Sequence, residues 1–301
     1  MENTLTWGIG LIKAIQTIEH PVLTVIMKVI TSLGSEFAYL AVIPLVYWCV
    51  DERKGIRLGV TLLLSAWLNS VLKAAWKQPR PYELDPSVGR ALEKSYGLPS
   101  GHAQGSLTFW GLVGSWMKAP LGLILAIGLP LLIGFTSLYL GVHFPTDVLA
   151  GWLLGAGVLA VYFLLGDTLE RVLAASNIRI RLLTVVAVAF AMNALHTEDT
   201  SLGGVFFGMG AGYLLMQSKF PFSAQLGADG QAAKPGILAL RFLLGLAVGA
   251  GLYLGLKMVF PGEASGSYAL FRFLRYGMVG VWVSAGAPWV FLRLKLVGIK
   301  V

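Results

Sequence analysis

Residues 119–166 read APLGLILAIGLPLLIGFTSLYLGVHFPTDVLAGWLLGAGVLAVYFLLG, and Asp147 is the one formally charged side chain among them. A helix that crosses the hydrocarbon core of a bilayer needs roughly 20 predominantly apolar residues. These residues are therefore numerous enough for two such helices, joined near residues 142–145. The pattern indicates a helical membrane protein that crosses the bilayer more than once.

The rest of the chain has the same character. Of its 301 residues, 56% are hydrophobic and 13% are charged, whereas soluble domains carry about 25% charged residues. This composition excludes a soluble enzyme, a secreted disulfide scaffold and a disordered chain. The net charge of +8 comes from basic residues in short clusters between apolar runs. Such clusters are typical of membrane loops, so we expect membrane lipids and no nucleic acid as partners.

Apolar runs recur along the whole chain and predict an all-α fold, a polytopic transmembrane helical bundle of about nine spans. The expected spans are residues 35–50, 57–76, 101–117, 121–141, 146–166, 182–195, 202–217, 238–260 and 276–292.

Four parts follow from these runs. Residues 1–33 are expected to form short helices, interfacial or packed on the bundle, with a new helix beginning at Pro21. Residues 34–166 are the predicted transmembrane core, and 167–181 a polar cytoplasmic connector. Residues 182–301 are expected to form a C-terminal transmembrane bundle.

The lysines and arginines predict the orientation. If the spans alternate, most of these residues fall on one side, which the positive-inside rule places in the cytoplasm. Residues 77–99 and 142–145 then face the opposite side, the periplasm or the cell exterior of a bacterial membrane. The four basic residues of 77–99 run against this bias, so they require another explanation.

The first chemical motif is Lys73 followed by Arg80, between Pro79 and Pro81. Seven residues are about two helical turns, so both cations can lie on one helix face. A rigid guanidinium fork and a point charge suit a phosphoryl group. The alternative is a pair of long cationic side chains that snorkel at the membrane edge.

The second motif is Pro99-Ser100-Gly101-His102, at the beginning of a predicted span. A hydroxyl, a glycine N–H and an imidazole at a helix N-terminus form an anion site with a titratable group beside it. The alternative is a serine N-cap with an incidental histidine.

The third motif is His143 followed four residues later by Asp147, with Pro145 between them, where the following helix can begin. Asp147 can hydrogen-bond one ring nitrogen of His143 and leave the other exposed as a nucleophile. The alternative is an acidic residue that stabilises a helix N-terminus. The predicted topology brings all three motifs to the same membrane face, so their side chains can converge.

In this order and spacing, the motifs resemble the tripartite signature of the type 2 phosphatidic acid phosphatase superfamily. The flanking residues 98–104 and 139–152 resemble its bacterial integral-membrane branch. The resemblance covers roughly residues 35–166. It implies hydrolysis of phosphate esters without a metal or another cofactor.

The resemblance also implies roles for individual residues. His143 attacks phosphorus and forms a phosphohistidine, Asp147 orients it, and His102 protonates the leaving oxygen. The phosphoryl oxygens are held by the remaining motif groups: Lys73, Arg80, Ser100 and the Gly101 amide. Fixed cations and amides are what the spread charge of a phosphoryl-transfer transition state requires.

One position departs from the family pattern. Thr136-Ser137 stands where the family carries Ser-Arg, so a third phosphate-binding cation is missing. Lys77, Arg90 and Lys94 are candidates to replace it.

The favoured function is a lipid phosphatase acting on phosphatidate-like lipids, phosphatidylglycerophosphate or polyprenyl diphosphates. A small phosphorylated solute, or transfer to another acceptor, stays open. Two alternatives also remain: a catalytically impaired family member that binds phospholipid, because of Ser137, or a transporter, because of the extra C-terminal spans. The oligomeric state is not predicted.

Overall fold

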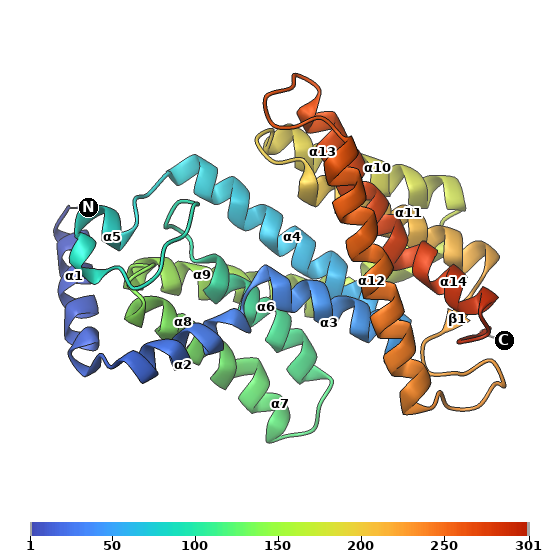
Figure 1. Cartoon of the computed structure of the whole chain (residues 1–301), viewed down its shortest axis with the longest axis horizontal. Helices are drawn as coiled ribbons and strands as arrows, with labels where there is room; N and C mark the ends of the chain where they lie inside the picture. The colour runs from blue at the N-terminus through green and yellow to red at the C-terminus, as the bar shows by residue number, and fades with distance from the viewer. Residues whose placement is uncertain (1, 300–301) are drawn as a thin grey trace. The chain divides into compact units, whose positions relative to one another are not determined.

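The computed structural model describes residues 2–299, and nearly all of its regular structure is helical (Figure 1). The chain divides into two compact units. Unit 1 contains the residues up to Tyr39 together with Leu64–Asp167, and unit 2 contains Leu40–Leu63 together with the residues from Thr168 onward. The candidate site lies entirely in unit 1.

Unit 1 is built from short and long helices around the irregular segment 89–100. Three helices contribute residues to both units: α3 (Glu36–Cys49), α4 (Glu52–Trp76) and α9 (Pro145–Ala175). The other helices of unit 1 are α1 (Glu2–Ile15), α2 (Pro21–Ser32), α5 (Pro81–Leu84), α6 (Gly101–Ser115), α7 (Leu121–Leu123) and α8 (Leu129–Tyr139), with 3₁₀ turns at Gln16–Ile18 and Pro86–Val88 and a π-helical segment at Ile124–Gly128.

The predicted helix beginnings at the prolines are confirmed. The chain bends by 119° between residues 5–18 and α2, which begins at Pro21. The imidazole of His20 caps α2 by accepting a hydrogen bond from the Val22 amide at 3.3 Å. Pro145 likewise begins α9. Proline suits the first helical position because that residue's N–H has no partner within the helix.

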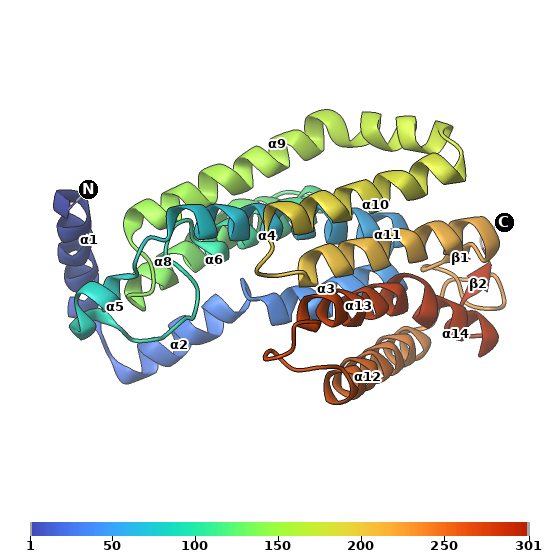
Figure 2. The same ribbon diagram turned by 90° about the horizontal axis from the view of Figure 1, so that it is seen from above.

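Helices α6, α8 and α9 pack against one another within unit 1, and Figure 2 shows α8 and the beginning of α9 running close together. The contact between α6 and α9 depends on Gly151. A Cβ at this position would lie 2.6 Å from the Ser100 carbonyl oxygen, so only glycine allows this approach. The beginning of α6 is thereby held against the beginning of α9.

Unit 2 contains α10 (Ile178–Leu195), α11 (Ser201–Lys219), α12 (Pro235–Val259), α13 (Tyr268–Val281) and α14 (Ala287–Arg293), with a π-helical segment at Trp282–Gly286. Strands β1 (Phe222–Ser223) and β2 (Gly298–Ile299) pair antiparallel, with Phe222 opposite Ile299. The fully buried Arg241 donates hydrogen bonds to the carbonyls of Ala224 and Leu296, so it ties the two ends of this small sheet together.

The chain is an integral membrane protein, but the expected nine spans are not confirmed. Within residues 2–299, five helical stretches are long and apolar enough to cross a bilayer, or six if the bent N-terminal pair counts as one span. The stretches are Glu52–Leu84, Leu121–Tyr139, Pro145–Ala175, Ile178–Leu195 and Pro235–Val259. Helices α3 and α6 have 14 and 15 residues, which is only about 21–23 Å at 1.5 Å per residue. Both fall short of a hydrocarbon core of about 30 Å.

Candidate active site

His143 lies in the turn between α8 and α9 and is fully buried. Gly141 makes this turn with φ +66°, a conformation that favours glycine. The Nδ1 atom of His143 lies 3.4 Å from Asp147 Oδ2, and the same oxygen accepts the Phe144 amide at 2.9 Å. Asp147 Oδ1 accepts a hydrogen bond from Gln78 Nε2 at 2.6 Å. Asp147 is thus fixed from three sides, and Nε2 of His143 is left facing the other motifs.

The surroundings of His143 keep its imidazole neutral. Burial lowers the pKa of His143 well below its ordinary value, and the nearby Arg80 charge lowers it further. The Glu93 carboxylate opposes these effects and does not reverse them. A neutral imidazole with one nitrogen held by a carboxylate has a free lone pair on the other nitrogen, which is the form that a nucleophile needs.

Arg80 is fully buried and is the nearest cation to the free face of His143. Its Nη1 donates to the Val142 carbonyl at 2.8 Å and lies 3.4 Å from His143 Nε2. Its Nη2 donates to Glu93 Oε2 at 2.6 Å, and its Nε donates to the Ser95 carbonyl at 2.6 Å. The guanidinium is therefore held by main-chain acceptors while one edge faces the histidine.

The expected arrangement of Lys73 and Arg80 on one helix face is wrong. Helix α4 ends at Trp76 and Lys77 has φ +49°, so Arg80 comes from an extended segment at the N-cap of α5. Lys73 is buried and donates to the main-chain carbonyls of Tyr96, and of Gly97 at 3.4 Å. It therefore holds the segment that precedes α6.

Ser100 and Gly101 stand at the N-terminus of α6, as predicted. The Ser100 hydroxyl accepts the Ala103 amide at 3.3 Å, and the Ser100 amide donates to the Asp147 carbonyl at 2.9 Å. Ser100 is thus an N-cap residue, the simpler of the two interpretations, and also ties α6 to α9. His102 Nδ1 lies 3.4 Å from Glu93 Oε1, with the imidazole 23% exposed.

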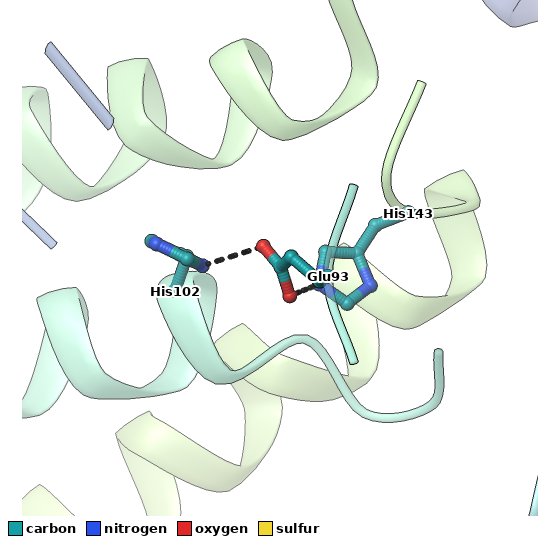
Figure 3. A group of neighbouring side chains, drawn as sticks. All are labelled: Glu93, His102 and His143. Carbon is teal, nitrogen blue, oxygen red and sulfur yellow. Dashed lines mark ion pairs between the residues drawn. The ribbon is translucent and has the colours of Figure 1, made fainter. Parts of the chain in front are cut away.

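Glu93 is a residue that sequence reasoning missed. Its carboxylate lies between the two histidines (Figure 3), with Oε1 toward His102 and Oε2 4.0 Å from His143 Nε2. Burial raises the pKa of Glu93, but the neighbouring charged groups, among them Arg80 and Lys73, lower it by more, so the pKa lies below its usual value and the group is ionised. The sequence offered little signal for it, because Glu93 is one of three acidic residues in 77–99, with Glu83 and Asp85.

Glu93, His102 and His143 are also a potential metal-binding group. One ligand atom from each lies within 4.8 Å of the other two. Histidine and carboxylate are zinc ligands by type, and the sequence spacing did not indicate that they come together. The positive charge of Arg80, which already contacts this carboxylate, opposes a divalent cation at the same place.

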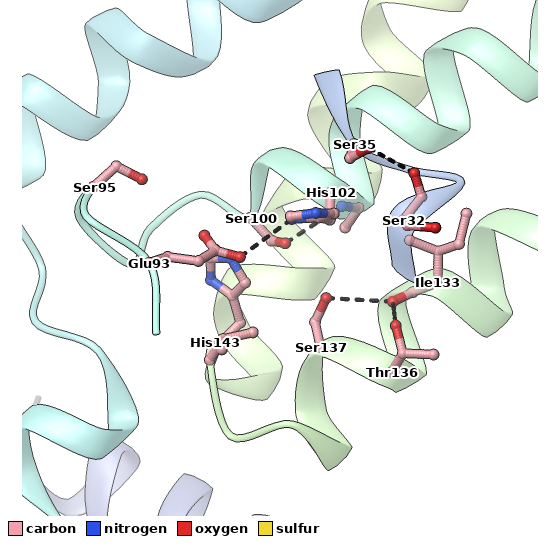
Figure 4. A network of polar contacts seen from close by, with 12 residues as sticks. Ser32, Ser35, Glu93, Ser95, Ser100, His102, Ile133, Thr136, Ser137 and His143 are labelled. Carbon is pink, nitrogen blue, oxygen red and sulfur yellow. Dashed lines mark hydrogen bonds and ion pairs between the residues drawn. The ribbon is translucent and has the colours of Figure 1, made fainter. Parts of the chain in front are cut away.

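Ser137 does not reach the histidines by a polar contact. It is fully buried, and its hydroxyl donates to the Ile133 carbonyl at 3.3 Å (Figure 4). Arg90 pairs with Glu19 at 2.6 Å, and Lys77 and Lys94 are exposed. Within residues 2–299, none of these three basic side chains makes a hydrogen bond or ion pair with the predicted site residues. The place of the family arginine is therefore not taken by any of them.

Comparison with known proteins matches two adjoining family descriptions. Residues 54–171 match the PAP2 superfamily, and residues 200–299 match the PAP2 superfamily phosphatase, transmembrane extension. The second match covers the C-terminal helices, which the motifs did not explain.

Named relatives include phosphatases of different lipids. An undecaprenyl-diphosphatase of Sulfolobus acidocaldarius is 31% identical over 164 residues, which cover 52% of this chain and 77% of the relative. The phosphatidylglycerophosphatase B of Bacillus subtilis is 29% identical, over 53% of this chain and 82% of the relative. A probable sphingosine-1-phosphate phosphatase of Dictyostelium discoideum is 26% identical over 63% of this chain, which spans half the length of that relative.

Proposed function

The chain belongs to the PAP2 superfamily of phosphatases, and from this premise we propose that it hydrolyses lipids with a terminal phosphate or diphosphate through a phosphohistidine at His143. The observation that carries the proposal is the position of His143. Nδ1 faces Asp147, Nε2 lies 3.4 Å from the Arg80 guanidinium, and burial lowers the pKa of the imidazole.

The proposed reaction has two steps. In the first, the Nε2 lone pair of His143 forms a bond to phosphorus while the bond from phosphorus to the leaving oxygen breaks. His102 gives a proton to that oxygen. In the second step, water attacks phosphorus, His102 takes a proton from the water, and the bond between nitrogen and phosphorus breaks. Inorganic phosphate leaves and His143 returns to its neutral form.

The other groups hold charge and position. Arg80 stabilises the charge that spreads over the phosphoryl oxygens, which is the main task of a protein in phosphoryl transfer. Asp147 holds the imidazole and stabilises the positive charge that develops on it. Lys73 supports the main chain before α6, where Ser100 and the Gly101 amide stand. No metal is assigned a role in these steps.

The proposed substrate is a membrane lipid, approached from the outer side of the membrane. The named relatives act on an undecaprenyl diphosphate, a phosphatidylglycerophosphate and a sphingosine phosphate. These compounds share a terminal phosphate on an amphiphile and differ in the rest of the molecule. The orientation is the one that the positive-inside rule predicts from the loop lysines and arginines.

A second candidate function is an impaired family member that binds phosphorylated lipids without turnover. The observation that favours it is Ser137, whose hydroxyl is directed to the Ile133 carbonyl where the family carries an arginine. Loss of one preorganised charged donor costs on the order of 2–4 kcal/mol in a transition state.

Phosphate release by the detergent-purified protein tests the proposal. The panel contains a phosphatidate, a polyprenyl diphosphate and a sugar phosphate, each with and without a chelator. We expect release from the lipids with the chelator present, and an acid-labile phosphoenzyme that His143→Ala abolishes. His196→Ala, a histidine change in unit 2, is the matched control.

Three results would overturn parts of the proposal. Binding of the lipids without release selects the impaired family member. Loss of release on chelation, with rescue by magnesium or zinc, rejects the metal-free reaction. Labelling of Ser87→Cys only from the cytoplasmic side rejects the orientation; Ser87 is exposed, and the native Cys49 is buried.

A further inference from the structure

The carboxylate of Glu93 lies where a phosphoryl group would have to bind. We propose that Glu93 occupies the phosphoryl position in the resting protein and competes with the substrate, which must displace it. The inference rests on the proposed function, since it assumes that His143 is the group that meets phosphorus.

The distances define the overlap. Glu93 Oε2 lies 4.0 Å from His143 Nε2 and 2.6 Å from Arg80 Nη2, and Oε1 lies 3.4 Å from His102 Nδ1. An atom ready for attack lies about 3–3.5 Å from its nucleophile. A phosphorus atom at that distance from Nε2, with oxygens near Arg80, would collide with this carboxylate. Substrate and Glu93 therefore exclude each other.

The contacts of Glu93 also match those expected of the substrate. Oε2 of Glu93 contacts Arg80, the cation that would hold a phosphoryl oxygen. Oε1 faces His102, the imidazole proposed to protonate the leaving oxygen (Figures 3 and 4). Charged hydrogen bonds from arginine to carboxylate and to phosphate have the same geometry. Glu93 thus satisfies the buried cation when no substrate is bound.

Exchange of Glu93 for the substrate favours the more highly charged group. A phosphate monoester has a second pKa of about 6 and carries nearly two negative charges at pH 7. A phosphodiester carries one, as the carboxylate does, so it gains no charge advantage at Arg80 over Glu93. The same carboxylate is displaced by either ester, so displacement lowers the affinity for both, and the advantage of a terminal phosphate comes from its own second charge at Arg80.

Displacement requires only the side chain to move. The Tyr82 hydroxyl donates to the Glu93 carbonyl at 2.8 Å and accepts the Glu93 amide at 3.1 Å, so the main chain is held. The neighbouring Gly97 amide donates to the Gln78 carbonyl at 2.8 Å. The Glu93 side chain is 27% exposed, which leaves it a direction in which to rotate out. The main chain around Glu93 therefore does not have to move.

A different role for Glu93 makes a different prediction. If the carboxylate orients His102 as the acid, its loss lowers kcat and leaves phosphate affinity and KM unchanged. If it competes with the substrate, its loss raises the affinity for phosphate, lowers KM and leaves kcat nearly unchanged. The two roles are therefore separated by comparing kcat with KM and by binding measured without turnover.

The test uses Glu93→Gln, which keeps the shape and removes the charge, and Glu93→Asp, which keeps the charge on a shorter side chain. Binding of inorganic phosphate to the full-length protein in detergent is measured by calorimetry, together with kcat and KM for a lipid monoester and a diester. Asp85→Asn removes a charge from the same loop, residues 77–99, and is the control; Asp85 pairs with Lys13 at 2.7 Å.

We expect Glu93→Gln to bind phosphate about tenfold more tightly and to lower KM by a similar factor for the monoester and the diester. Glu93→Asp should fall between this variant and the native protein, and Asp85→Asn should match the native protein. A phosphate affinity that does not rise in Glu93→Gln, including no binding by either protein, would overturn the inference. So would a fall in kcat at constant KM.

The failure of this inference can be told from the failure of the proposed function. Tighter phosphate binding in Glu93→Gln without turnover by any protein rejects the phosphatase and keeps the role of Glu93. Normal turnover with unchanged phosphate binding rejects the role of Glu93 and keeps the phosphatase. If Glu93→Gln does not fold, the same comparison between Glu93→Asp and the native protein decides the question.

Discussion

Replacement of Asp147 by asparagine separates the charge of this residue from its ability to orient His143. In Ser-His-Asp triads the same change costs about 10⁴-fold, because the amide donates to the histidine and selects the wrong tautomer. Here Asp147 Oδ2 accepts the Phe144 amide at 2.9 Å as well as facing His143 Nδ1 at 3.4 Å. The Phe144 N–H therefore requires an acceptor at that position.

The asparagine is consequently expected to keep its oxygen toward Phe144 and His143. Its NH₂ group then takes the place of Oδ1, where Gln78 now donates at 2.6 Å. Gln78 can turn its side-chain amide and accept instead. The His143 tautomer is retained, and what is lost is the charge that stabilises the developing imidazolium. A hydrogen bond to a charged group contributes about 1.5–3 kcal/mol, so we expect kcat to fall roughly 10- to 150-fold.

The assay is single-turnover formation of the phosphoenzyme by Asp147→Asn, with thermal unfolding as the check on folding. Asp229→Asn, which neutralises an exposed carboxylate in unit 2, controls for expression and detergent behaviour. A loss near 10⁴-fold would show that the amide has turned and that Phe144 does not fix it. A loss below about threefold would remove Asp147 from the mechanism.

Three further outcomes are expected. His102→Ala should retain phosphoenzyme formation with an activated leaving group, which needs little protonation; equal loss for poor and good leaving groups in single-turnover assays would contradict its role as the acid. Ser137→Arg should bind vanadate about tenfold more tightly, equivalent to about 1.4 kcal/mol, and should lower Tm because the position is fully buried. Unchanged vanadate binding would place residue 137 away from the phosphoryl group. The pKa of His143 lies below its ordinary value of 6.5, so its imidazole stays neutral below pH 6.5. Phosphoenzyme formation with an activated ester should therefore stay level as the pH falls from 8 through 6.5. Rapid-quench rates with a midpoint at 6.5 would be inconsistent with a buried, neutral nucleophile.

Several local features of the fold were predictable because they depend on a few neighbouring residues. Proline at the first helical position predicts the beginnings of α2 and α9, and both are observed. A serine before a helical run predicts the N-cap of α6, which Ser100 supplies. The number of spans was less predictable, because the length of an apolar run does not show where a helix within it bends or ends.

The prediction for Lys73 and Arg80 failed for a related reason. Seven residues of separation correspond to one helix face only if the helix continues, and α4 ends at Trp76. Arg80 nevertheless lies beside His143, because Val142 and Ser95 supply acceptors for its guanidinium. The sequence spacing indicated Arg80 correctly, but it assumed a helix that continues to residue 80, and the structure has no such helix.

The sequence by itself determined the membrane-embedded helical character and the residues of the three motifs, because hydropathy, proline positions and short spacings act locally along the chain. Only the tertiary structure decided which side chain lies near the Nε2 atom of His143. Glu93 lies fifty residues away in an irregular segment, where no periodicity predicts the direction of a side chain. Its position depends on Tyr82 holding its main chain and on Arg80 meeting its carboxylate, two contacts that exist only once the chain has folded.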